Sequence, residues 1–125
     1  MMKIGAVLLV LLMSAVAPMS VGAQQLSSNE TYNQIGEALL AYTAVAQACD
    51  HRQLRDLKTT VVQYLEFLNR KDALTRAGRS IYRNATGAIE RGVREFQRRP
   101  YVTCGEAPRY YANLMASARE AIRSG

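Results

Sequence analysis

The stretch from Leu54 to Leu68, LRDLKTTVVQYLEFL, decides the fold class of this chain. Its apolar residues recur at intervals of three and four, which gathers them on one face of an α-helix. That face consists of Leu54, Leu57, Val61, Tyr64 and Leu68, with Val62 and Leu65 reinforcing it. We therefore predict an amphipathic helix that ends somewhere between Asn69 and Ala77, with Gly78 as the clearest break.

Three further segments have the same spacing. Residues 30–49 carry Tyr32, Ile35, Leu39, Tyr42, Ala46 and Cys49; residues 80–98 carry Ile81, Tyr82, Ala85, Ala88, Ile89, Val93 and Phe96; residues 108–122 carry Tyr111, Leu114, Met115, Ala118 and Ile122. No strand-like alternation of any length interrupts them. Short loops between amphipathic helices predict an all-α fold, a small up-down-up-down four-helix bundle.

Local signals mark the helix ends. Ser27 and Glu30 have the spacing of a capping box before the first helix. Asp50 can accept hydrogen bonds from the first turn of the second helix. Pro100 forbids continuation of the third, and Pro108 suits the first turn of the fourth.

The N-terminal segment predicts export. Lys3 precedes an uncharged apolar run, and Val21-Gly22-Ala23 offers small residues to a signal peptidase. We predict a cleaved signal peptide over residues 1–23 and a single helical domain over residues 24–125, periplasmic or secreted. The alternative is an uncleaved membrane anchor, because residues 4–23 just reach the ~20 residues that span a bilayer.

The two cysteines predict a disulfide. Cys49 lies between the first and second predicted helices and Cys104 between the third and fourth, which is the same end of such a bundle. Exported compartments are oxidising, so an even pair of cysteines favours a bridge. In the chain-entropy model a loop of about 55 residues contributes ~4 kcal/mol.

The composition argues against several kinds of chemistry. The chain of 125 residues is 49% hydrophobic and 21% charged, as expected of a folded domain, and it has one His and two Cys. That inventory excludes zinc fingers, multi-histidine metal sites and c-type haem attachment. Cys49-Asp50-His51 is interpreted as a bridged cysteine, a helix cap and a solvated histidine. We therefore predict a non-enzymatic protein with no catalytic residue, metal or cofactor.

An arginine face is predicted on the third helix. On one continuous helix Arg83, Arg91, Arg94 and Arg98 fall within about 80° of one another, opposite the apolar residues. Residues 24–125 contain thirteen Arg and two Lys, and guanidinium groups suit carboxylates and phosphates. The face is a candidate site for an anionic partner, such as a lipid head group or acidic polysaccharide. An ordinary solvated surface, or a bias in codon usage, would give the same pattern.

Three tyrosines are predicted near the disulfide: Tyr101, Tyr110 and Tyr111. They are either anchors of a protein interface or a plug for the end of the bundle. The leading hypothesis is a protein-binding module of the inhibitor, immunity-factor or envelope-chaperone type, and the alternative is the electrostatic binder. We expect another exported protein as partner rather than nucleic acid, which exported compartments usually lack. A homodimer is a further option, because residues 24–69 carry a net charge of −2.

The general plan is similar to that of small exported helical proteins with one disulfide, such as periplasmic acid-stress chaperones and secretion-system immunity proteins. The similarity covers size, export and cysteine count. It assigns no role to any residue.

Overall fold

The structure, a computed structural model, describes residues 28–125 and is helical with no strand over that range. Its helices are α2 (Ser28–Ala48), α3 (Leu54–Arg70), α4 (Arg76–Arg83), α5 (Ala85–Arg98) and α6 (Pro108–Ser124). The predicted all-α class is confirmed. The predicted signal peptide and the capping residue Ser27 lie outside the described residues.

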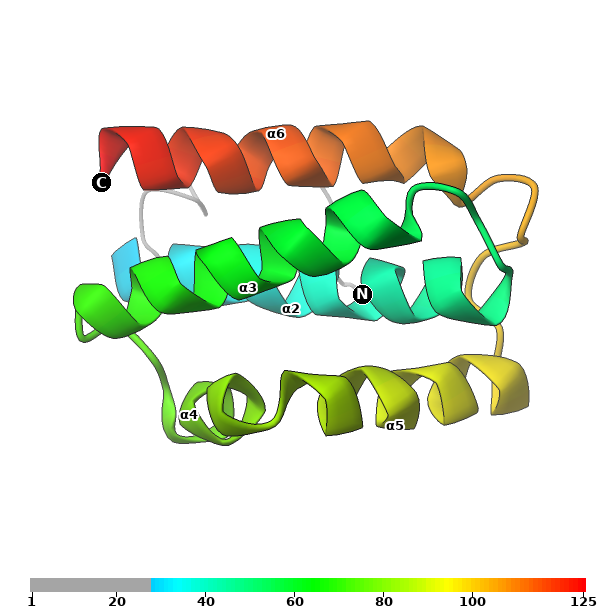
Figure 1. Ribbon diagram of the computed structural model, residues 1–125, viewed down its shortest axis with the longest axis horizontal. Coiled ribbons are helices and arrows are strands. Elements are labelled where there is room, and N and C mark those ends of the chain that lie inside the picture. Colours follow the sequence, from blue (N-terminus) through cyan, green and yellow to red (C-terminus); the bar gives the residue numbers. More distant parts are fainter. Residues whose placement is uncertain (1–27) are drawn as a thin grey trace, which may run out of the picture. The chain divides into compact units, whose positions relative to one another are not determined.

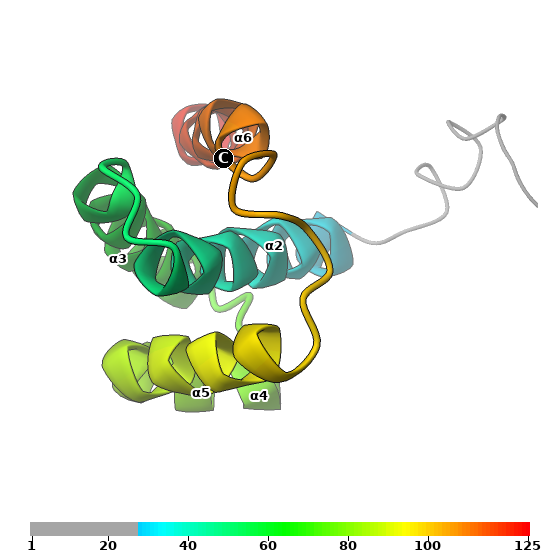
Figure 2. The ribbon, with the colours of Figure 1, turned by 90° about the vertical axis from the view of Figure 1, so that its right-hand side faces the viewer.

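The chain divides after Thr31 into two units, and the second, Tyr32–Gly125, contains every contact on which the candidate site depends. Within this unit, successive long helices run in alternating directions (Figure 1). Viewed from the side, α2 and α3 form a middle layer, with α6 on one side of it and α4 and α5 on the other (Figure 2).

The core contains residues from every predicted helix face, together with Val45, Thr43 and Thr60, which the three-and-four spacing did not place there. Its largest fully buried side chains are Tyr64, Tyr111, Leu39, Leu57, Leu68, Val45, Thr43 and Thr60. The Tyr64 hydroxyl donates a hydrogen bond to the carbonyl oxygen of Tyr32 at 2.7 Å, so this buried polar group is satisfied. Val62 departs from the prediction: it is 50% exposed, because the buried face of α3 runs through its neighbour Val61.

The third helix was predicted to be continuous over residues 80–98, and this prediction is wrong. The structure has two helices here, α4 and α5, divided at Asn84. Asn84 has φ −148° and ψ 68°, outside the helical region, and its side chain accepts a hydrogen bond from the Gly87 amide at 3.0 Å. Short polar side chains compete with the helix backbone in this way and favour caps. The division places Arg83 on α4 and the other predicted arginines on α5.

Gly78 is likewise not the break that the sequence suggests. It is buried inside α4, and that helix begins after Thr75, whose hydroxyl accepts from the Gly78 amide at 3.0 Å. A Cβ at Gly78 would lie 3.1 Å from the Leu74 side chain. The glycine therefore serves close packing at the start of the helix, and the preceding helix α3 has already ended at Arg70.

Asp50 does not cap α3, contrary to prediction. The residue before α3 is Gln53, with no side-chain capping bond. Asp50 has φ 58°, and the amides of Asp50 and His51 bond to the carbonyls of Gln47 and Ala46. This is the Schellman arrangement, which closes α2 with a left-handed residue after its last turn.

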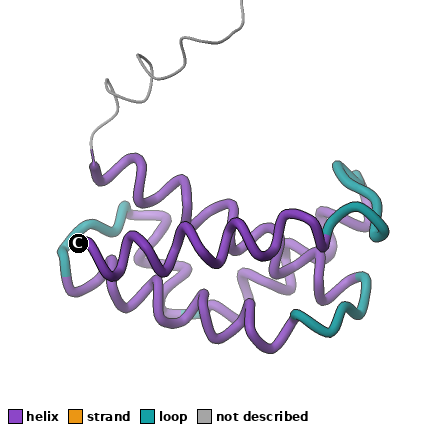
Figure 3. Tube along the Cα trace, turned by 90° about the horizontal axis from the view of Figure 1, so that it is seen from above, coloured by secondary structure: helices purple, strands orange, loops and turns teal. Residues whose placement is uncertain are grey.

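The disulfide joins the two loops that the topology brings to one end of the second unit. Cys49 and Cys104 are bridged, with their Cα atoms 5.7 Å apart, as predicted. The loops after α2 and after α5 lie at this end, and the loop after α3 lies at the other (Figure 3). The third predicted helix ends at Arg98, before Pro100, and Pro108 occupies the first turn of α6, also as predicted.

The helices α2 and α5 approach closely at one point. A Cβ added at Gly92 would lie 2.8 Å from the Cβ of Ala44, a residue with no exposed surface. Real Cβ atoms do not come this close, so glycine allows the approach. The contact fixes α5, and with it Phe96, beside α2.

Candidate functional site: a tyrosine cluster beside the disulfide

Four tyrosines gather at the disulfide end of the second unit and are called here the tyrosine cluster: Tyr42, Tyr101, Tyr110 and Tyr111. They come from three places in the chain. Tyr42 lies on α2, seven residues or about two turns before Cys49. Tyr101 lies in the loop that contains Cys104, and the adjacent pair Tyr110 and Tyr111 lies in the first turn of α6.

Tyr42 is the centre of the cluster. Its ring centroid lies 6.2 Å from that of Tyr101, 5.4 Å from that of Tyr110 and 6.2 Å from that of Tyr111. The contacts with Tyr101 and Tyr111 are edge-to-face, the arrangement that aromatic quadrupoles favour. Phe96 extends the cluster from α5, with its centroid 5.4 Å from that of Tyr101. One half-buried ring therefore supports three others.

The inner side of the cluster is fixed by a hydrogen bond. Tyr111 has no exposed surface, and its hydroxyl lies 2.9 Å from Nδ1 of His51 in the loop after α2. Burial, and then the charge of neighbouring phenols, raises the pKa of Tyr111 to about 12. The hydroxyl therefore stays protonated at neutral pH and can donate to an unprotonated Nδ1.

The outer side of the cluster faces solvent. Tyr101 is 55% exposed and Tyr110 is 41% exposed. The Tyr101 hydroxyl donates to the carbonyl oxygen of Ala41 at 3.3 Å. The Tyr101 side chain is therefore held both by this hydrogen bond and by its ring contacts with Tyr42 and Phe96. Burial raises the pKa of both Tyr42 and Tyr101, with the neighbouring tyrosine as the second cause. The two exposed rings thus stand on a rigid aromatic base.

The structure brings the three predicted aromatics, Tyr101, Tyr110 and Tyr111, into this one cluster. The central residue, Tyr42, was not predicted as part of a site, because it lies on an apolar helix face that is typical of the core. Its separation of seven residues from Cys49 was the available signal. His51 was predicted to be solvated, whereas it is half-buried against Tyr111.

The predicted arginine face is placed in two parts. Arg91, Arg94 and Arg98 line one shallow hollow on α5 together with Glu95 and Gln97. Arg98 forms an ion pair with Glu95 at 2.8 Å, both exposed. Within residues 28–125 neither Arg91 nor Arg94 makes an ion pair. Arg83 was predicted on the same face of one continuous helix, and this prediction is wrong because the helix is divided at Asn84.

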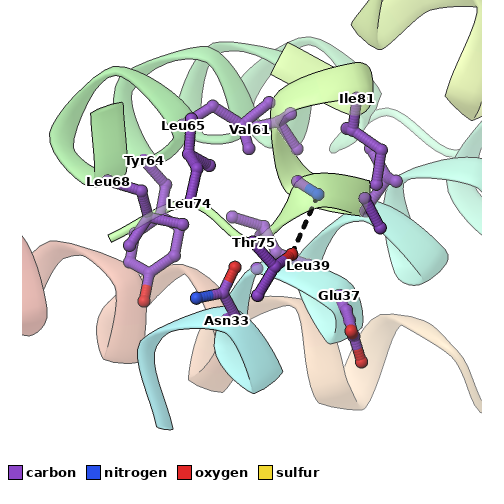
Figure 4. A pocket seen from close by; sticks show the side chains of 14 residues that line it. Asn33, Glu37, Leu39, Val61, Tyr64, Leu65, Leu68, Leu74, Thr75 and Ile81 are labelled. Atoms are coloured by element: carbon purple, nitrogen blue, oxygen red, sulfur yellow. Dashed lines mark hydrogen bonds between the residues drawn. The ribbon is translucent and has the colours of Figure 1, made fainter. Parts of the chain in front are cut away.

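A small cavity lies between α2, α3 and α4, away from the tyrosine cluster (Figure 4). Its volume is about 30 Å³, and its walls are mainly apolar side chains such as Leu39, Tyr64 and Leu74. Asn33 lies at its edge and donates to the carbonyl oxygen of Ala73 at 2.8 Å. Ligand pockets measure ~300–1,000 Å³, so this space has room for water rather than for a substrate.

Three searches of the chain gave no further site. Among residues 28–125, no three His, Cys, Asp or Glu side chains are grouped so that they could hold a metal ion. The helices of that same region include none that is long and apolar enough to cross a membrane. No protein-family model, curated protein or solved structure matches the chain.

Proposed function

We propose that this chain is a small exported, non-enzymatic protein that binds another protein through the tyrosine cluster. The observation that carries the proposal is the exposed pair Tyr101 and Tyr110, which stands on the half-buried ring of Tyr42. Tyrosines dominate binding hot spots because they offer a large contact area and lose little conformational freedom. Here that freedom is already restricted in the free protein.

The proposed scaffold is an up-down-up-down four-helix bundle whose third helix is divided at Asn84. The bridge between Cys49 and Cys104 then keeps the loop that carries Tyr101 against the end of α2. Pre-organised binding surfaces reduce the entropy lost on association. An inhibitor, an immunity factor or an envelope chaperone would each use such a rigid end.

The local chemistry supports a binding role over a catalytic one. The His51 imidazole is hydrogen-bonded to Tyr111, whose hydroxyl is buried and protonated at neutral pH. The nearest thiol groups are joined in the disulfide, so they cannot act as nucleophiles. The proposal accordingly assigns no catalytic residue.

The test is capture of partners from an envelope extract of the source cell, with oxidised protein over residues 24–125 as bait. The comparison bait carries Tyr101→Ala and Tyr110→Ala, and the control carries Tyr82→Ala, a tyrosine of α4 that is 37% exposed. We expect one identified protein to be retained at high salt by wild type and control and lost by the double variant. Purified partner must then bind directly. Equal retention by the double variant would rule the tyrosine cluster out.

The second candidate function is electrostatic binding of an anionic envelope component through the α5 arginines. The observation that favours it is the hollow lined by Arg91, Arg94 and Arg98, where Arg98 alone has an ion-pair partner among residues 28–125. Exposed charge contacts weaken as ionic strength rises. Binding to anionic vesicles or an acidic polysaccharide should therefore vanish at high salt and in the variant with Arg91, Arg94 and Arg98 changed to Glu. Binding that survives both changes would exclude this function.

A further inference from the structure

Each exposed tyrosine of the cluster has an arginine next to it in the chain. Only Pro100, with its fixed φ, separates Arg99 from Tyr101, and Arg109 directly precedes Tyr110. Both arginine side chains are exposed, and neither forms an ion pair with any residue from 28 to 125. Two exposed arginines therefore lie next to the outer tyrosines of the cluster in the chain.

The acidic groups of the same region already have partners. Glu95 pairs with Arg98, and Glu106 accepts a hydrogen bond from the Thr103 hydroxyl at 3.2 Å. Between residues 91 and 111 the chain has five arginines and two glutamates. Within residues 91 to 111, which include Tyr101 and Tyr110, positive charges thus outnumber negative ones.

We infer that the partner presents an acidic peptide segment, with an apolar or aromatic side chain between its carboxylates. That side chain contacts Tyr101 and Tyr110, and the carboxylates bind Arg99 and Arg109. A guanidinium group offers a planar fork of donors that matches a carboxylate, and tyrosine with arginine is the typical composition of a hot spot. This inference rests on the proposed function, and it adds the chemistry of the partner.

A polyanion without apolar groups fits this surface less well. A polysaccharide or a phosphate-rich surface would engage the guanidinium groups alone and leave the tyrosine rings without a contact. An acidic peptide satisfies both kinds of group at once. The charge complementarity would also speed association at low salt.

The experiment uses three probes on the oxidised protein at low and high salt: a glutamate–tyrosine copolymer, polyglutamate and heparin. We expect the copolymer to bind most tightly and to keep measurable affinity at high salt. Arg99→Gln with Arg109→Gln should weaken copolymer binding by about tenfold or more, as loss of two hot-spot contacts does. The control, Arg70→Gln with Arg76→Gln, removes the same charge from the exposed ends of α3 and α4 and should change copolymer affinity by less than about twofold.

The outcomes separate this inference from the proposed function. The acidic partner is wrong if the Arg99 and Arg109 changes weaken copolymer binding no more than the control changes do, or if no probe binds. An identified partner that needs Tyr101 and Tyr110 would still leave the proposed function standing. If heparin and polyglutamate bind as tightly as the copolymer and the Tyr variants bind normally, the surface is a polyanion site and both proposals fail. Circular dichroism of every variant shows whether it is folded.

Discussion

Nδ1 of His51 and the hydroxyl oxygen of Tyr111 lie 2.9 Å apart, although sixty residues separate them in the chain. The bond ties the loop after α2 to the first turn of α6. It holds the buried member of the tyrosine cluster in place, and the ring of that residue, Tyr111, contacts the ring of Tyr42. The buried side of the proposed binding surface is thus fixed by a polar contact and not by packing alone.

Removing this hydroxyl should destabilise the protein. Tyr111→Phe keeps the ring but leaves the His51 nitrogen without its partner, so we expect a loss of about 1 kcal/mol in the free energy of unfolding, the usual net value of such a bond. Denaturant titration measures it. Tyr110→Phe is the matched control and should change stability by less than about 0.5 kcal/mol, because Tyr110 is exposed. Equal effects of the two variants would contradict the assignment.

Breaking the disulfide should lower the free energy of unfolding by more than Tyr111→Phe does. Changing Cys49 and Cys104 to Ser frees a loop that spans 55 positions, and the chain-entropy model gives a loss of about 4 kcal/mol. Urea unfolding of the variant and of reduced wild type should give the same loss. An intact mass of the native protein that corresponds to two free thiols would refute the bridge itself.

Asp50→Gly should stabilise the protein. Asp50 has φ 58°, a conformation in which a side chain costs roughly 1 kcal/mol and glycine costs little. We expect a gain of up to about 1 kcal/mol in thermal or denaturant unfolding, since the Schellman bonds use only backbone groups. Asp72, with φ 55°, gives a second instance at the end of α3, and Asp72→Gly should behave alike. A loss of stability in both would show that the carboxylates matter more than the backbone.

Gly92→Ala should destabilise the protein, although alanine is normally the better helix former by about 1 kcal/mol. The new Cβ would meet the Cβ of Ala44 at 2.8 Å, and neither atom can rotate away. Forcing α2 and α5 apart costs ~1–3 kcal/mol. Adding Ala44→Gly should restore part of the loss in the double variant. A stabilised single variant would show that α5 is not fixed against α2 at this point.

Alkaline pH should weaken the fold as the buried tyrosines ionise. The pKa of Tyr111 is about 12 in the folded chain against 10.0 for a free tyrosine, and burial also raises the pKa of Tyr42 and Tyr101. A raised pKa means that the folded state holds the proton more tightly, so this contribution is complete below pH 10 and is lost as the pH rises toward 12. Tyrosinate absorbance and unfolding measured together should rise in step. Phenols that all ionise near pH 10 without unfolding would contradict the burial.

The helices could be predicted from the sequence because burial imposes a period on apolar residues. The face from Leu57 to Leu68 is buried as expected, and Pro100 and Pro108 flank the loop that they should flank. Asp50 was misassigned and the cap at Asn84 was missed because short polar residues can cap a helix at either end, and sequence alone does not say which backbone groups are free. Their roles depend on which helix the neighbouring turns join.

The candidate site was predicted in part for a similar reason. Tyr101, Tyr110 and Tyr111 lie close to the predicted bridge in the sequence, so their grouping followed from the topology. Tyr42 and His51 lie near Cys49 in the sequence, whereas the three predicted tyrosines lie near Cys104. The contacts of Tyr42 and His51 with Tyr111 form only when α2 and α6 pack together. Arg83 was placed wrongly on the arginine face because its angular position was counted at 100° per residue through Asn84, where the helix is broken. The apolar periodicity did not reveal that break.

The bridge also changes what a protease can do to this chain. The ring closed by Cys49 and Cys104 contains the whole of α3, α4 and α5, whereas α2 and α6 extend from it on either side. A cut in the exposed part of the loop after α3, at Lys71 or Asp72, leaves two fragments that are still covalently joined. All four tyrosines of the cluster then remain in one molecule, so a nicked protein can keep the proposed binding surface.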